Sequence, residues 1–100
     1  MNNRLFSIYS RYFHSKINIP IVRLYTKDNC SLCIPVKQLI SEVKQEYNFQ
    51  YIEVDITDKN NKKAYNLYKY DIPVISVNDI EIARHSLSKE QLINSLLDKK

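Results

Sequence analysis

Hydrophobic and polar positions follow two different periods along residues 20–100, and these periods predict strands and helices in turn. A run of β-branched and apolar residues at 21–26 predicts a buried strand. Apolar residues recurring every three or four positions from about 31 to 47 predict a helix, which Pro35 must either delay or bend. Strict alternation of apolar and polar residues over 50–56 predicts a second strand.

The second half of the chain continues with a helix, a hairpin and a last helix. The first of these helices is expected to be capped by Thr57 or Asp58 and to run to about Tyr70. Its inward-facing residues should be Ala64, Leu67 and Tyr68. Strands at 73–77 and 81–84 flank Asn78-Asp79, two residues that tolerate the positive φ angles of a tight hairpin turn.

The last helix is expected to begin at the capping box Ser88-Lys-Glu-Gln91. Its apolar positions are Leu92, Ile93, Leu96 and Leu97. The order β-α-β-α-β-β-α predicts an α/β fold with a mixed four-stranded sheet and flanking helices. The first two strands should be parallel, and the closing hairpin should add an antiparallel edge.

Residues 1–19 differ from the rest in charge and composition. They carry Arg4, Arg11 and Lys16 and no acidic residue, and their apolar residues follow the spacing of one helical face. Such a segment resembles a mitochondrial transit peptide. The alternative is a disordered or helical extension. We therefore expect a domain at 20–100 and a mitochondrial location, or otherwise a cytoplasmic one.

Composition and charge exclude several function classes. The chain has no glycine, which rules out glycine-rich phosphate loops. The net charge of +4 belongs to the N-terminus, because residues 28–100 carry ten basic and eleven acidic side chains. This weakens a nucleic-acid interpretation, which needs a basic face on the folded domain. No apolar run approaches the length of a membrane span. We expect the protein to be a monomer.

The candidate chemistry lies at Cys30 and Cys33, which are separated by two residues between a predicted strand and a predicted helix. A helix N-terminus carries a partial positive charge that stabilises a thiolate, the reactive form of cysteine, and Lys27 adds a further charge nearby. Two cysteines at this spacing are close enough to form a disulfide. We expect Cys30, at the exposed helix tip, to attack a target disulfide and the more buried Cys33 to resolve the mixed disulfide.

Two other interpretations of the cysteine pair remain open. The thiols could be reduced small residues of the core. Alternatively they could be half of a zinc site, but tetrahedral zinc needs four ligands and the only histidines are His14 and His85. We therefore expect no complete metal site within one chain.

Three segments resemble the glutaredoxin-like proteins of the thioredoxin-fold superfamily. They are Leu24-Tyr-Thr-Lys-Asp-Asn-Cys-Ser-Leu-Cys33, Glu53-Val-Asp-Ile56 and Tyr70-Asp-Ile-Pro-Val-Ile75. The resemblance covers about residues 20–98 and is closest to members with a C-S-L-C centre and a D-I-P-V segment. It implies a thioredoxin-like fold, with Cys30 and Cys33 as a redox-active disulfide.

The resemblance also implies how a substrate binds. Pro73 should follow a cis peptide bond and face the cysteine pair, which leaves the backbone of Ile72 free to pair with an incoming peptide or glutathione. Lys27 should contact a carboxylate of glutathione. In glutathione-using members a Gly-Gly pair stands where this chain has Ala83-Arg84. Because Arg84 adds bulk and charge there, we expect no bound cofactor, and glutathione as a co-substrate at most.

The expected function is that of a thiol–disulfide oxidoreductase acting by dithiol exchange through the C-x-x-C centre. Its partner would be a disulfide-containing protein or a glutathione mixed disulfide. One alternative is a non-catalytic protein-binding module that uses the Ile72–Pro73 edge. Another is a glutathione-dependent iron–sulfur carrier in which Cys30 ligates a cluster shared by two chains.

Overall fold

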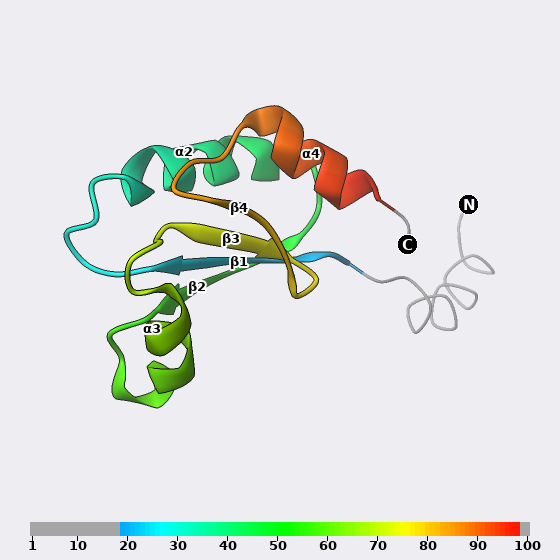
Figure 1. The fold of residues 1–100 in the computed structure, drawn as a ribbon. Coiled ribbons are helices and arrows are strands. Elements are labelled where there is room, and N and C mark those ends of the chain that lie inside the picture. The colour runs from blue at the N-terminus through cyan, green and yellow to red at the C-terminus, as the bar shows by residue number, and fades with distance from the viewer. Residues whose placement is uncertain (1–18, 99–100) are drawn as a thin grey trace, which may run out of the picture.

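Four strands form one mixed sheet in the computed structural model, which describes residues 19–98 (Figure 1). The strands are β1 (Ile21–Thr26), β2 (Gln50–Asp55), β3 (Val74–Val77) and β4 (Ile80–Arg84). They lie in the order β2-β1-β3-β4, with β1 parallel to β2 and β3 antiparallel to both β1 and β4. The predicted mixed four-stranded sheet is confirmed.

Helices cover both faces of this sheet. They are α2 (Cys33–Lys44), the 3₁₀ turn η1 (Lys59–Asn61), α3 (Lys62–Tyr68) and α4 (Lys89–Leu97). Figure 1 shows α2 and α4 above one face and the short α3 below the other. None of the helices within 19–98 has the length and apolar character needed to cross a membrane. The predicted transit peptide, or extension, lies outside the described residues.

The main core lies between the sheet and the α2–α4 layer. β1 alternates between half-buried and buried residues, so that Val22 and Leu24 face this layer. Residues of the core from the other elements include Val36, Ile40, Val43, Phe49, Ile75, Val77 and Leu92. Burial of a side chain of this size contributes about 1.5–3 kcal/mol relative to exposure.

Pro35 lies in the first turn of α2, where proline is tolerated. The helix begins at Cys33, so Pro35 is its third residue. The first N–H groups of a helix have no partner within the helix, and a missing N–H therefore breaks no hydrogen bond there. The helix ends at Lys44, three residues before the predicted end.

The helix predicted between Thr57 and Tyr70 is shorter than expected. A 3₁₀ turn comes first, capped by Asp58, whose Oδ1 accepts a hydrogen bond of 2.9 Å from the N–H of Asn60. The α-helix that follows has only seven residues. The prediction that Leu67 faces inward was wrong, because so short a helix contacts the sheet along one narrow face and leaves Leu67 57% exposed.

The predicted hairpin and capping box are both confirmed. Asn78 and Asp79 have φ angles of 52° and 69°, and Ser88 and Gln91 form both hydrogen bonds of the box. The amide N–H of Asn78 also donates to the carbonyl of Ile21, at 2.9 Å. The helix runs from Lys89 to Leu97, and its last residue, Leu97, is 59% exposed because it lies at the last turn, beyond the core.

Candidate active site

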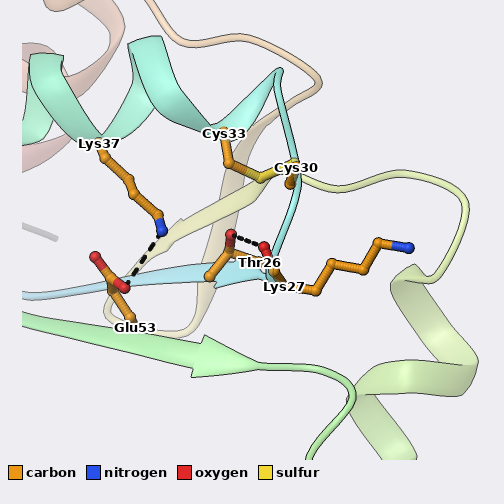
Figure 2. Close-up of a disulfide and its surroundings, with 6 residues drawn as sticks. All are labelled: Thr26, Lys27, Cys30, Cys33, Lys37 and Glu53. Atoms are coloured by element: carbon orange, nitrogen blue, oxygen red, sulfur yellow. Dashed lines mark hydrogen bonds and ion pairs between the residues drawn. A yellow bond between two sulfur atoms is a disulfide. The ribbon is translucent and has the colours of Figure 1, made fainter.

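A disulfide joins Cys30 and Cys33 at the point where β1 leads into α2 (Figure 2). The two Cα atoms are 5.3 Å apart, within the usual range for a disulfide. Between β1 and Cys30 the chain turns at Asn29, which has a φ angle of 62°. The N–H of Cys33 donates to the carbonyl of Cys30 at 3.1 Å, so the four residues form a closed turn before the helix.

The two sulfurs differ in burial. Cys33 is 1% exposed and is the first residue of α2, whereas Cys30 is half-buried and lies three residues before the helix. The predicted order of burial is confirmed, although Cys30 lies before the helix and not at its tip. A group arriving from solvent therefore reaches Cys30 more easily than Cys33.

The N-terminus of α2 keeps its partial positive charge. Its first turn holds no acidic residue, and the N-cap residue, Leu32, makes no side-chain hydrogen bond to the helix. A helix N-terminus stabilises a nearby anion by about 0.3–1 kcal/mol, and by up to about 2 kcal/mol in partly buried sites. The chain therefore leaves this charge available to a thiolate at the start of the helix.

An open pocket of about 420 Å³ lies beside Cys30. Its lining residues include Lys27, Asn29, Cys30, Ile34 and Lys37. Figure 2 shows Lys27 and Lys37 on opposite sides of the disulfide, with Lys37 directed towards Glu53, which lies 3.7 Å away. Sequence reasoning missed Lys37, although its position one helical turn after Cys33 was a usable signal.

The Ile72–Pro73 peptide bond is cis, which confirms the prediction. Val74 lies opposite Tyr25 in the antiparallel register of β3 and β1. One step further along this register, Pro73 comes level with Thr26, from which the loop to Cys30 departs. The cis bond and the disulfide therefore lie at the same end of the sheet, as Figure 1 shows for the segments that carry them.

Burial and hydrogen bonding differ between the two residues of the cis bond. Pro73 is fully buried, and its carbonyl accepts a hydrogen bond of 2.7 Å from the N–H of His85. Ile72 is half-buried, and its backbone groups form no hydrogen bond within residues 19–98. Within that range, a free backbone edge lies immediately before Pro73.

Arg84 is paired within the chain. Its Nε and one terminal nitrogen donate to the carboxylate of Glu81 at 2.6 and 2.8 Å, and the other terminal nitrogen lies 3.0 Å from Asp71. The hydrogen bonds from Arg84 lower the pKa of Glu81, and those to Glu81 raise the pKa of Arg84. Sequence reasoning did not anticipate these contacts.

Tyr25 contributes packing to the opposite face of the sheet. Its ring centroid lies 4.7 Å from that of Tyr68 on α3. Burial raises the pKa of Tyr68, and the neighbouring Tyr25 adds to the effect. Within residues 19–98, no group of three or more His, Cys, Asp or Glu side chains could hold a metal ion.

Solved structures with the same fold include several thioredoxins. A protein from Nitrosomonas europaea superposes with a TM-score of 0.68 at 18% identity, covering 96% of this chain and 99% of its own. Oxidised thioredoxin O2 from Arabidopsis thaliana gives 0.57 at 19% identity, with 87% and 83% covered. A malarial protein gives 0.61 at 25% identity, with 78% and 93% covered. The fold is thioredoxin-like.

Sequence comparison identifies the family to which this thioredoxin-like domain belongs. A curated glutaredoxin-like protein from Dictyostelium discoideum is 30% identical over 79 residues, which cover 75% of this chain and 73% of that protein. The model of the glutaredoxin-like domain (DUF836) matches residues 21–97, from the start of β1 to the end of α4. The chain therefore belongs to the glutaredoxin-like domain family.

Proposed function

We propose that this protein is a thiol–disulfide oxidoreductase that acts by dithiol exchange between Cys30 and Cys33. The observation that carries the proposal is the disulfide at the start of α2, with Cys33 buried and Cys30 accessible. Membership of the glutaredoxin-like family supports a redox role in general. The difference in burial supports Cys30 as the attacking sulfur and Cys33 as the resolving one.

The reaction begins from the reduced dithiol. The Cys30 thiolate attacks one sulfur of a target disulfide, so that a mixed disulfide forms and the other target sulfur leaves as a thiolate, which takes up a proton. Cys33, having lost its proton, then attacks Sγ of Cys30 and releases the second target thiolate. The target gains two electrons and the enzyme is left as the Cys30–Cys33 disulfide. A low-molecular-weight thiol or a protein dithiol must return two electrons to complete the cycle.

We propose a protein disulfide as the substrate. The free backbone edge of Ile72 is suited to pair with an extended peptide. Leu32 and Ile34, which flank Cys33, are 55% and 57% exposed and offer apolar contact to a polypeptide. Lys27 remains the proposed contact for a substrate carboxylate. Arg84, where glutathione-using relatives have glycine, makes glutathione the poorer candidate.

The direct test is reduction of insulin disulfides by the purified full chain in the presence of dithiothreitol. The wild-type protein should accelerate the reaction, and Cys30→Ser should abolish the acceleration. In a separate reaction without dithiothreitol, pre-reduced Cys33→Ser should accumulate a mixed disulfide with insulin, detected by mass spectrometry, because Cys30 can attack but no second thiol is present to resolve the product. Wild-type protein no faster than Cys30→Ser would disprove the enzymatic proposal.

A non-catalytic protein-binding module is the second candidate, and the exposure of Leu32 and Ile34 beside the disulfide favours it. The same cysteine variants distinguish the binding module from the oxidoreductase. A binding module would hold its partner equally well as wild type or Cys30→Ser and would form no mixed disulfide. Leu32→Ser would weaken binding by such a module, whereas an oxidoreductase would still reduce a small disulfide such as hydroxyethyl disulfide.

A further inference from the structure

Two consecutive residues at the end of β4 contact both ends of the Asp71–Pro73 segment. The carboxylate of Asp71 lies 3.0 Å from a guanidinium nitrogen of Arg84 and 3.3 Å from Nε2 of His85. At the other end, the carbonyl of Pro73 accepts from the N–H of His85 at 2.7 Å. Ile72 lies between these contacts and makes no backbone hydrogen bond of its own within residues 19–98.

A β-bulge produces this arrangement. In the β3–β4 register, Ser76 lies opposite Glu81 and Ile75 lies opposite Ala83, so Ile82 is an extra residue on β4. In a regular strand, residues three apart point to opposite faces. The extra residue brings Glu81 and Arg84 to the same face, where the guanidinium forms its paired hydrogen bonds with Glu81.

Glu81 fixes the orientation of Arg84. Two of its donor nitrogens are bound by the Glu81 carboxylate, and the third remains directed at Asp71. A bidentate arginine–carboxylate pair restricts the planar guanidinium more than a single contact does. His85 has a left-handed backbone, with a φ angle of 74°, which directs its N–H to Pro73.

We propose that Asp71, Glu81, Arg84 and His85 form a clasp that positions the free backbone edge of Ile72 for a substrate polypeptide. The inference rests on the proposed function and names Arg84 and Asp71 as positioning residues, which act through Ile72 and Pro73. With the clasp intact, the edge is ordered before the substrate arrives. Without it, binding must also order this segment, and the affinity for an extended substrate falls.

The test compares two ion pairs of the same type. Asp71→Asn and Arg84→Gln open the clasp, whereas Asp79→Asn and Arg23→Gln remove the ion pair at the β3–β4 turn. For reduction of a protein disulfide, the clasp variants should raise KM about tenfold, within the factor of about 5–30 expected when one more residue must be ordered on binding. Their kcat should stay within about twofold, because the cysteines are unchanged.

A small substrate supplies the internal control. Hydroxyethyl disulfide has no backbone to pair with Ile72, so its kcat/KM should be the same in wild type and Asp71→Asn. Asp79→Asn should leave KM unchanged for both substrates. An equal loss with both substrates, or an equal rise in KM in the Asp71 and Asp79 variants, would overturn the proposal in favour of a purely structural role.

Failure of the proposed function can be told apart from failure of the clasp. Wild-type protein that reduces no disulfide disproves the oxidoreductase proposal. In that case amide hydrogen exchange still tests the clasp, because opening it should speed exchange of the His85 N–H at least tenfold in Arg84→Gln and leave it unchanged in Arg23→Gln. Unchanged exchange in Arg84→Gln overturns the clasp, whatever the activity.

Discussion

Reduction of the Cys30–Cys33 disulfide should lower the free energy of unfolding by an amount that depends on pH. The bond closes a loop of only four residues. For a loop of this size, the restriction of the unfolded chain is worth about 2 kcal/mol. This is the expected difference between the oxidised and the reduced chain at about pH 5, where both thiols are neutral.

At higher pH a second effect opposes the first. The N-terminus of α2 has no acidic residue in its first turn, and we expect it to stabilise a Cys30 thiolate by about 1 kcal/mol. Such a thiol ionises at lower pH in the folded chain than in the unfolded chain, where the pKa is about 8.5. The extra stability of the reduced fold is therefore absent in acid and complete above about pH 8.5. The Cys30 thiolate should therefore narrow the difference in free energy of unfolding between the oxidised and the reduced chain from about 2 to about 1 kcal/mol.

Urea unfolding followed by circular dichroism measures this difference at pH 5, 7 and 8.5, with and without a phosphine reductant. Cys33→Ser keeps the Cys30 thiol and should gain stability between pH 5 and 8.5 relative to Cys30→Ser, which lacks it. Cys33→Ser that gains no stability relative to Cys30→Ser across this range would refute thiolate stabilisation at Cys30. It would also favour the binding module over the enzyme.

Three further predictions concern stability. The buried hydroxyl of Ser76 has no hydrogen-bond partner within residues 19–98, and burying such a group costs about 1–3 kcal/mol. Ser76→Ala should therefore raise the thermal midpoint, by about 4–8 °C for each kcal/mol gained. A lower midpoint would mean that the hydroxyl is paired. Burial, and then the hydrogen bond to Glu53 and its charge, raise the pKa of Tyr51 far above its usual value of 10.0. Tyr51 therefore stays protonated in the folded chain and ionises in the unfolded one, so the free energy of unfolding should fall as the pH rises above 10. In Tyr51→Phe this fall should be less steep. Equal slopes for the two chains in urea unfolding measured at several pH values would contradict the prediction. Ser88→Ala removes the acceptor of the capping box and should cost about 1 kcal/mol in the same assay, whereas the exposed Ser86→Ala should cost nothing measurable.

Most of the fold could be predicted because several local signals agree with one another. The alternation in β1, the Asn78-Asp79 turn and the capping box at Ser88 each depend on neighbouring residues alone. The cysteine pair and Pro73 were also found from local motifs. That Pro73 faces the cysteine pair was expected only from the family resemblance; in the structure, the pairing of β1 with β3 brings the end of β1 beside the start of β3.

Features that depend on distant packing could not be predicted. The helical spacing of Leu67 was correct, but its exposure follows from the shortness of α3 and from how little of the sheet that helix covers. The contacts of Arg84 depend on the bulge at Ile82, and nothing in the local sequence distinguishes this residue from a regular strand position. A regular strand would have placed Glu81 and Arg84 on opposite faces.

The lack of glycine has a specific consequence at the end of β4. The four residues with positive φ within 19–98 are Asn29, Asn78, Asp79 and His85, all of the types that most often adopt this conformation in place of glycine. The first three residues adopt, in turns, a backbone conformation that glycine adopts most easily. His85 does more, because the imidazole reaches Asp71 while the backbone N–H reaches Pro73. The resemblance implies a glycine pair where this chain has Ala83 and Arg84, and both Arg84 and the following His85 contact Asp71, just before the cis bond. Arg84, which makes glutathione the poorer proposed ligand, is therefore also one of the contacts proposed to order the peptide-binding edge.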